Sequence, residues 1–110
     1  MPPDGTTPVH THEQEDEAFL VLEGELEVVI DGTPHTVRAG EAAFAPRGIP
    51  HQLRNTSGRP VRGIVIATPS GFDEFVTAAG VRTETATLLP PPTPEALAAA
   101  ADRFGIRIAA

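Results

Sequence analysis

Short apolar runs separated by turn residues fill the first 70 positions of the chain. Residues 18–22 form one such run, which stops before Gly24 and predicts a strand buried on both faces. Residues 42–45 predict a second short strand. Asp31-Gly32 lies between two apolar segments, a position typical of a β-hairpin turn. The pattern therefore predicts that this part of the chain is built from short strands joined by tight turns.

The last forty residues follow a different, helical pattern. Ser70 is a candidate N-cap, and apolar residues at helical spacing continue from it to Gly80. After a proline-rich linker, Thr93 is a second candidate N-cap, and Gly105 stands where a left-handed C-cap would end that helix. We predict two short helices that dock on the strands or on a partner subunit.

Length and composition narrow the class of protein. A chain of 110 residues can form one modest core. Without cysteine it has neither a disulfide framework nor a thiol nucleophile, and we expect a cytoplasmic protein. A formal charge of -7 argues against nucleic acid or anionic lipid as a partner. The sequence contains no apolar run long enough to cross a bilayer, so no membrane partner is expected.

Three histidines and one glutamate carry the candidate chemistry. His10 and His12 point to the same face of a strand, because side chains alternate along it. Glu17 lies an odd number of residues further on, so a turn or bulge within the acidic residues 13–16 has to re-aim it. The hairpin would bring His51 back toward this strand. Imidazole and carboxylate groups together form a ligand set for a divalent transition metal.

Two motifs with these residues resemble those of the cupin superfamily. The leading glycine departs from the first motif, because Gly5 stands four rather than five residues before His10. The resemblance covers roughly residues 5–70, and the tail after it is similar to that of a bacterial subgroup labelled quercetinase-like. The first motif is matched by His10, His12, Glu17 and Gly24, and the second by Gly40, Pro46, Gly48, His51 and Asn55.

The resemblance implies an all-β fold, a small antiparallel jelly-roll β-barrel, with short C-terminal helices. Residues 1–70 would form the cupin barrel, and residues 71–110 would form a helical tail packing on the barrel or on a dimer partner. It also implies one divalent ion (Fe, Mn, Ni, Zn or Cu), and an apolar space above it for a small-molecule substrate. The implied metal ligands are His10, His12, Glu17 and His51, and the residues expected to line the substrate pocket are Phe19, Val21, Phe44 and Leu53.

The N-terminus leaves almost no chain for strands before the first motif. The barrel would then begin at the ligand strand and leave an open sheet edge, which is prone to unwanted pairing. A partner subunit, the C-terminal tail or a longer natural N-terminus would each cover that edge. Small cupins are commonly dimers, and the apolar strands offer more surface than one barrel interior needs, so we expect a homodimer.

Three functions remain open at this point. The first is a metal-dependent dioxygenase acting on a small phenolic or enolic molecule, in which Glu17 is a fourth ligand or a general base. The second is a redox-neutral polyketide cyclase or isomerase, and the third is a non-catalytic module that binds a small molecule. Fold alone does not choose between these functions.

Overall fold

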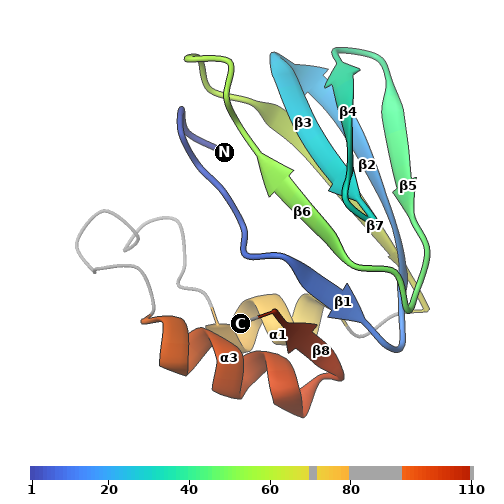
Figure 1. Ribbon diagram of the computed structural model, residues 1–110, viewed down its shortest axis with the longest axis vertical. Helices are drawn as coiled ribbons and strands as arrows, with labels where there is room; N and C mark the ends of the chain where they lie inside the picture. Colours follow the sequence, from blue (N-terminus) through green and yellow to red (C-terminus); the bar gives the residue numbers. More distant parts are fainter. Residues whose placement is uncertain (70–71, 80–92, 110) are drawn as a thin grey trace.

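A computed structural model describes residues 1–69, 72–79 and 93–109 of the chain. Figure 1 shows a sandwich of strands with the helices gathered at one end. The predicted caps Ser70 and Gly80 lie outside the described residues. In chain order the elements are β1 His10–His12, β2 Asp16–Glu23, β3 Glu25–Ile30, β4 Thr33–Arg38, β5 Ala42–Ala45, β6 His51–Arg54, β7 Arg62–Thr68, α1 Phe72–Ala79, α3 Pro94–Arg103 and β8 Ile106–Ile108.

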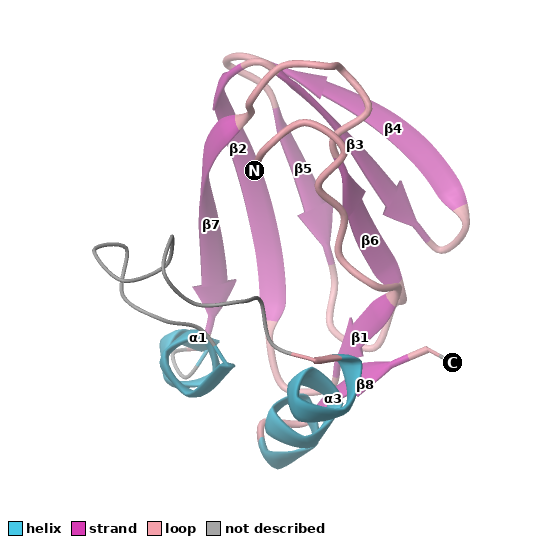
Figure 2. Ribbon diagram, turned by 90° about the vertical axis from the view of Figure 1, so that its left-hand side faces the viewer, coloured by secondary structure: helices cyan, strands magenta, loops and turns pink. Residues whose placement is uncertain are grey.

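The strands form two antiparallel sheets that face each other (Figure 2). One sheet has five strands in the order β4-β3-β6-β1-β8, and the other has three in the order β5-β2-β7. The predicted hairpin turn joins β3 to β4, with Asp31 at φ 49° and Gly32 at φ 80°. Two facing antiparallel sheets with short helices near the C-terminus confirm the predicted fold class.

The core lies between the two sheets and consists mainly of alternating strand residues. Because neighbouring side chains of a strand point to opposite faces, only every second residue of β2 contributes to it. The buried members of this core are Phe19, Val21, Leu26, Val28, Val37, Ala45 and Val61.

The prediction that residues 18–22 are buried on both faces is wrong for this chain. The residues of β2 that alternate with the core residues point outward, and the side chain of Leu22 is 40% exposed. Its neighbours on β5 and β7 present apolar side chains to the same side. We call this surface the outer apolar face; it comprises Ala18, Leu20, Leu22, Ala42, Phe44, Ile64 and Ile66.

Two segments cover the sheet edges next to the ligand strand. The tail supplies β8, which pairs with the whole of β1. The N-terminal segment runs beside β6 (Figure 1), where Thr7 N donates to Leu53 O and Asn55 N donates to Gly5 O. Of the three ways to cover the edge that the sequence left open, the structure therefore shows the one in which the tail does so.

The second predicted helix has the expected ends. Thr93 accepts a hydrogen bond from Ala96 N through its side chain, Pro94 occupies the first turn, and Gly105 follows the helix at φ 71°. In the part of the chain that is described, no helix has the length and apolar character needed to span a membrane.

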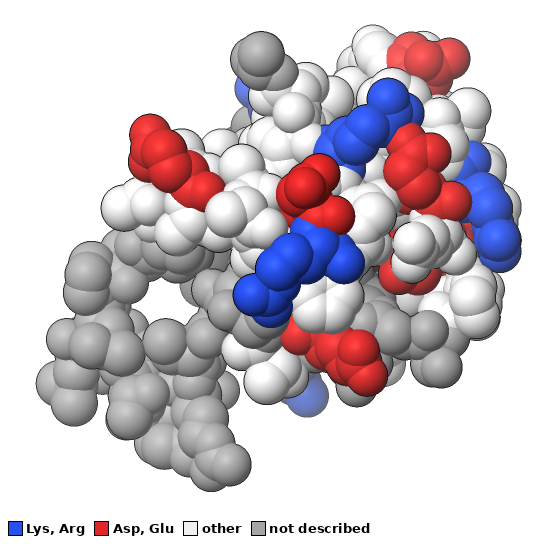
Figure 3. All heavy atoms as spheres, turned by 90° about the horizontal axis from the view of Figure 1, so that it is seen from below, with Lys and Arg blue, Asp and Glu red and all other residues white. Residues whose placement is uncertain are grey.

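Charged side chains of both signs are interspersed on the surface at the helical end (Figure 3). Arg47 pairs with Asp16, and Arg107 pairs with Glu13. Pairs of this exposed kind contribute little to stability, but they leave no broad surface of one charge on this face.

Candidate metal centre

The four predicted metal ligands meet at one point between the sheets. His10 and His12 come from β1, Glu17 from the start of β2 and His51 from the start of β6. One ligand atom from each lies within 4.8 Å of the others. Two donors on opposite sides of an ion stand about 4 Å apart, so the cluster is of the right size for a single ion.

The local structure explains why these side chains converge. The i and i+2 positions of β1 put both of its rings on one face, and His51 lies directly opposite His10 in the antiparallel register with β6. The chain turns between β1 and β2, so that Glu17 returns to the site from the facing sheet. The sequence predicted this turn from the odd spacing of Glu17.

The Nδ1 atom of each ligand imidazole has an acceptor. His10 Nδ1 lies 2.8 Å from Pro8 O, and His51 Nδ1 lies 3.2 Å from Ile49 O. Because a carbonyl oxygen only accepts, both Nδ1 atoms carry the proton, and the Nε2 atoms keep their lone pairs for a metal. Fixing the tautomer in this way is what second-shell partners do for metal-binding histidines.

His12 has a carboxylate in place of a carbonyl. Its Nδ1 lies 3.2 Å from Glu15 Oε2, and the Glu15 residue is only 4% exposed. The sequence predicted a turn or bulge in residues 13–16, but it did not predict that Glu15 would be buried next to a ligand histidine. The sequence signal that could have indicated this contact is a carboxylate three residues after a ligand histidine, within a turn short enough to bring the carboxylate back to the imidazole.

The electrostatics of the cluster favour an ionised Glu17. Burial alone would raise the pKa of Glu17, but the His12 and His51 rings that face its carboxylate lower the pKa to about 2. Burial also lowers the pKa of His10, to about 4, and the neighbouring His51 and His12 rings act in the same direction. Burial lowers the pKa of His12 too, but Glu17 and Glu15 outweigh it and raise that pKa above its ordinary value.

The atoms at the centre fit a bound cation. Glu17 Oε1 lies 2.5 Å from His12 Nε2 and 3.3 Å from His51 Nε2. Glu17 Oε1 and His51 Nε2 are nevertheless buried without a well-formed hydrogen bond to any described residue. Buried polar atoms normally have partners, and an ion held by the carboxylate and imidazoles would supply one. The residues present therefore fit a divalent transition metal.

Asn55 supports the fold around the site. It is 1% exposed, and its Nδ2 donates to Met1 O, Pro2 O and Arg59 O. Its Oδ1 accepts from Ser57. These hydrogen bonds tie the N-terminal segment to the loop after β6, so the Asn55 side chain acts as a support for this loop.

The predicted pocket residues divide into two groups. Phe19, Val21 and Leu53 line one cavity of about 220 Å³, and the Phe19 ring lies 5.8 Å from that of His51. Phe44 is 57% exposed, because its register opposite Ala18 turns it to the outer apolar face. The structure thus corrects the grouping of Phe44 with the other three, whose contact with a substrate stays a prediction.

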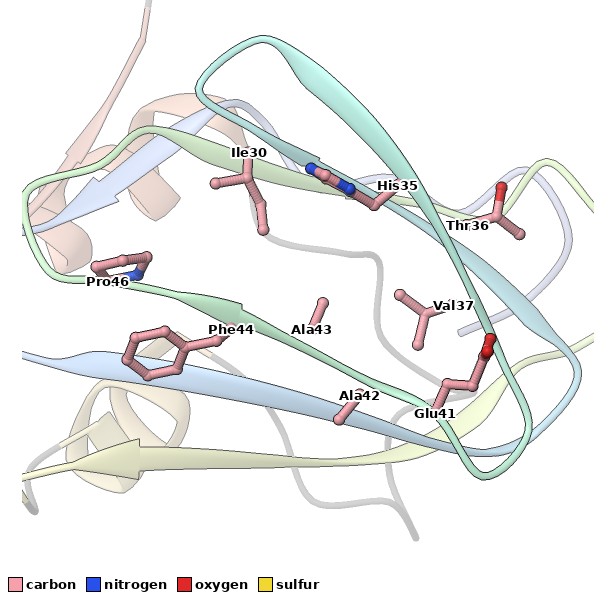
Figure 4. Close-up of a pocket in the computed structure, with 9 residues that line it drawn as sticks. All are labelled: Ile30, His35, Thr36, Val37, Glu41, Ala42, Ala43, Phe44 and Pro46. Carbon is pink, nitrogen blue, oxygen red and sulfur yellow. The ribbon is translucent and has the colours of Figure 1, made fainter.

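Phe44 borders a different cavity, of about 580 Å³, between β4 and β5 (Figure 4). Phe44 and Pro46 lie toward one end of it, and Glu41 lies at the other. None of the four ligand residues lines this cavity, and Glu41 Oε1 is already used by Arg38 N. This cavity is therefore not a candidate for the substrate site of the metal centre.

A smaller, apolar cavity of about 140 Å³ touches the candidate ligand cluster itself. His10 and His12 form part of its wall, and most of the remainder comes from the C-terminal tail. The sequence did not predict the lining residues from the tail, since they lie more than sixty positions after His10 and His12. We call this cavity the tail chamber; it is lined by Thr7, Pro8, His10, His12, Phe75, Leu97, Ala101, Ile106 and Ile108.

Comparison with known proteins agrees with this geometry. The family model described as "Cupin domain" matches residues 1–67, more than half of the chain. The chain belongs to the cupin family. Residues 72–79 and 93–109, which build much of the tail chamber, lie outside that match.

Similar cupins have different functions. The chain is 40% identical over 52 residues to quercetin 2,3-dioxygenase of Bacillus subtilis (strain 168), a match that covers 47% of this chain and 15% of that protein. The structure of TT1209 from Thermus thermophilus superposes with a TM-score of 0.60 at 38% identity, covering 63% and 66% of the two chains. A cupin described as a sugar phosphate isomerase, from Silicibacter pomeroyi, has a TM-score of 0.58 at 30% identity, covering 64% and 46%.

Other relatives are germin-like proteins and an HTH-type transcriptional regulator. This cupin spans well under half the length of the first curated relatives that it matches. Enzymes and a regulator thus both share the fold, and the family by itself does not decide the activity.

Proposed function

We propose that this cupin is a metal-dependent enzyme that oxidises a small phenolic or enolic molecule with dioxygen. The observation that carries the proposal is the largely buried cluster of three imidazoles and one carboxylate, whose ligand atoms lie within 4.8 Å of one another next to an apolar chamber. The similarity to quercetin 2,3-dioxygenase supports the reaction class. Burying a carboxylate and imidazoles between two sheets costs free energy, so a cluster of this composition would not help a protein that needed only a stable core.

His10, His12, Glu17 and His51 would hold the ion. A bound redox-active ion supplies a Lewis acid that favours ionisation of a substrate hydroxyl and an electron pathway to dioxygen. The ionised Glu17 adds a negative charge that strengthens cation binding. With a pKa of about 2 it is a weak base, which favours the ligand role of Glu17 over that of general base.

The surrounding residues control access and orientation. The imidazole tautomers are fixed through Pro8, Ile49 and Glu15, so the ligands need little rearrangement when an ion binds. The apolar walls of the tail chamber exclude water from one side of the site and leave the imidazoles as its polar end. These residues can thus place an apolar molecule next to the metal site.

Elemental analysis of the purified protein tests the metal site directly. We expect close to one equivalent of a transition metal per chain in the wild type, and a large loss in His10→Ala and His51→Ala. His35→Ala is the matched control, because His35 is an exposed histidine outside the cluster. Equal metal content in all four proteins would contradict the site.

Dioxygen consumption tests the reaction. The iron, manganese and nickel forms are each supplied with a panel of one-ring phenols, flavonols and β-diketones, and uptake is followed with an oxygen electrode. We expect uptake with at least one pair of metal and substrate, abolished in Glu17→Ala. Absence of uptake across the panel, with the metal shown to be bound, would contradict the dioxygenase proposal.

A redox-neutral isomerase or cyclase is the second candidate, favoured by the likeness to the sugar phosphate isomerase. It would form a product of unchanged mass under anaerobic conditions, which mass spectrometry together with chromatography detects. Ligand binding without turnover in either assay would instead point to a binding module, as the similarity to a transcriptional regulator allows.

A further inference from the structure

The tail chamber has a defined position on the ligand strand. Ile106 and Ile108 of β8 lie opposite His12 and His10 in the register, so these four side chains share one face of the sheet. Leu97 and Ala101 of α3 and Phe75 of α1 cover that face. The C-terminal tail therefore packs against one side of the candidate ligand cluster, and not on a remote part of the barrel.

Packing and hydrogen bonds hold the chamber walls in place. Ala101 is 1% exposed and Ile106 is 4% exposed. Backbone bonds from Glu13 N to Gly105 O and from Ala109 N to Val9 O attach β8 at both ends. A wall fixed at these points sets a definite volume for a ligand.

The size of the chamber restricts what can enter. A volume of about 140 Å³ is close to that of an engineered protein cavity, about 150 Å³, that binds benzene. One six-membered ring with a small substituent fills such a space. A flavonol, with three rings, is larger than this space and would extend out of it.

The side chains that line the chamber restrict the class of ligand further. Six of the lining side chains are apolar, and none of the lining residues within the described part of the chain is a lysine, an arginine or a carboxylate. The Thr7 hydroxyl already accepts a hydrogen bond from Leu53 N. A sugar or a phosphate would leave several polar groups without partners there, which strongly disfavours binding. Among the described lining residues, the imidazoles and the Thr7 hydroxyl, whose O–H can still donate, are the groups that could face a polar atom of the ligand.

We propose that the tail chamber receives a single aromatic ring, with a hydroxyl directed toward His10 and His12, and that Leu97 helps to set the upper size limit. This inference rests on the proposed function for the metal and the reaction, and adds the substrate class and the part of the chain that selects it. Specificity then lies in the tail, outside the segment shared with the cupin domain.

The zinc-loaded protein allows binding to be measured without turnover, because zinc is not redox-active. The probes are 4-methylphenol, 2-naphthol and quercetin, titrated by calorimetry, with toluene as the analogue without a hydroxyl. We expect 4-methylphenol to bind at least about 10-fold more tightly than 2-naphthol, quercetin not to bind in the chamber, and toluene to bind more weakly than 4-methylphenol.

Substitutions at Leu97, a half-buried residue, keep the test interpretable. Leu97→Ala enlarges the chamber and should narrow the preference for one ring over two by at least about 5-fold, whereas Leu97→Phe should weaken 4-methylphenol binding by about 10-fold or more. Ala99→Phe is the matched control, since it adds the same ring at an exposed position of α3 and should leave both affinities unchanged. Circular dichroism of each variant confirms that it is folded.

Failure of this inference and failure of the proposed function give different results. Selective binding of 4-methylphenol without dioxygen uptake would leave the chamber in place and contradict the dioxygenase. Equal binding of one, two and three rings, or an identical profile in Leu97→Ala and wild type, would overturn the chamber proposal, even if a flavonol were oxidised.

Discussion

At the scale of single residues, one hydrogen bond decides which ring nitrogen of each ligand imidazole is free to bind a metal. A backbone carbonyl holds Nδ1 of His10 and of His51, so those two rings keep their tautomer whatever the surrounding side chains are. His12 depends on a side chain, Glu15, which a substitution can remove. Of the three ligand imidazoles, the His12 ring is therefore the one whose tautomer and orientation a single substitution of a neighbouring side chain could disturb.

Removing the Glu15 carboxylate should weaken metal binding. In Glu15→Ala, His12 loses its Nδ1 partner and ring orientation, and second-shell losses of this kind reduce affinity by about 10-fold to 100-fold. Competition with a chromophoric chelator gives the affinity. Glu13→Ala is the control, because Glu13 lies in the same turn but is exposed and faces Arg107. Equal affinities in the two variants would show that Glu15 has no positioning role.

Among the cluster residues with a shifted pKa, His12 should contribute most to the pH dependence of metal binding near neutral pH. At neutral pH, His10 with a pKa of about 4 and Glu17 with a pKa of about 2 are already deprotonated. The raised pKa of His12 means that an incoming ion competes with a proton there. Affinity should therefore fall as the pH drops below that pKa, by about tenfold per unit, and fall more steeply as the pH nears the pKa of His10, about 4.

Calorimetry in buffers of different ionisation enthalpy measures the protons released on binding. We expect release at about pH 6 that diminishes as the pH rises above the pKa of His12, and an affinity that strengthens over the same range. An affinity independent of pH between about 5 and 8 would contradict this assignment.

At the scale of elements, two glycines with positive φ form the turns before and after β3. Gly24 joins β2 to β3 at φ 87°, and a Cβ there would lie 2.8 Å from Pro60 O. Gly32 has a similar φ of 80°, but a Cβ would meet nothing within 4 Å. Both glycines thus have a backbone conformation that would be strained for any other residue. Of the two, Gly24 alone would also bring a side chain against a neighbouring backbone atom.

Alanine at the two positions should separate these effects. Gly32→Ala should lower the free energy of unfolding by about 1–2 kcal/mol, the penalty for a left-handed L-residue. Gly24→Ala should lose at least about 1 kcal/mol more, because the carbonyl of Pro60 has to move. Urea denaturation measures both values. Equal losses would mean that the backbone around Pro60 relaxes freely.

Local rules predicted some elements of the site and not others. Alternation along a strand placed His10 and His12 together, and cap residues placed the second helix, because both signals lie within a few positions. The strand β8 is only three residues long, and its partner β1 lies almost the whole chain away, so periodicity carries no information about it. The prediction that β2 is buried on both faces failed for a related reason. Apolar residues indicate that a surface is favoured to be covered, but they do not show whether the same chain or another molecule covers it.

At the scale of the whole molecule, the outer apolar face is the feature that a single chain leaves unexplained. Phe44, Ile66, Ile64 and Leu22 are between 40% and 57% exposed on it. A continuous apolar surface of this kind is unusual on a monomer. Ion pairs border it, Arg47 with Asp16 at one end of β2 and Arg62 with Glu23 at the other, so a second copy related by a two-fold axis would meet both signs at its rim.

The homodimer therefore stays a prediction, now with this face as its interface. Ile66→Glu should shift the protein to monomers, because it would bury a charge in the interface. Val76→Glu is the control, since both side chains are 52% exposed in the chain but Val76 lies on α1. Analytical ultracentrifugation measures the assembly. A wild type that stays monomeric up to high micromolar concentration would contradict the prediction.

The order of the ligands along the chain has a consequence for biosynthesis. All four metal donors lie within the first 51 residues, while the tail's part of the chamber wall begins at Phe75 and is completed by Ile108. On the ribosome, the donors emerge well before the segments that later enclose them. If the cluster binds an ion, that ion could enter from the surrounding solution while the nascent site is still uncovered, before the tail folds over it.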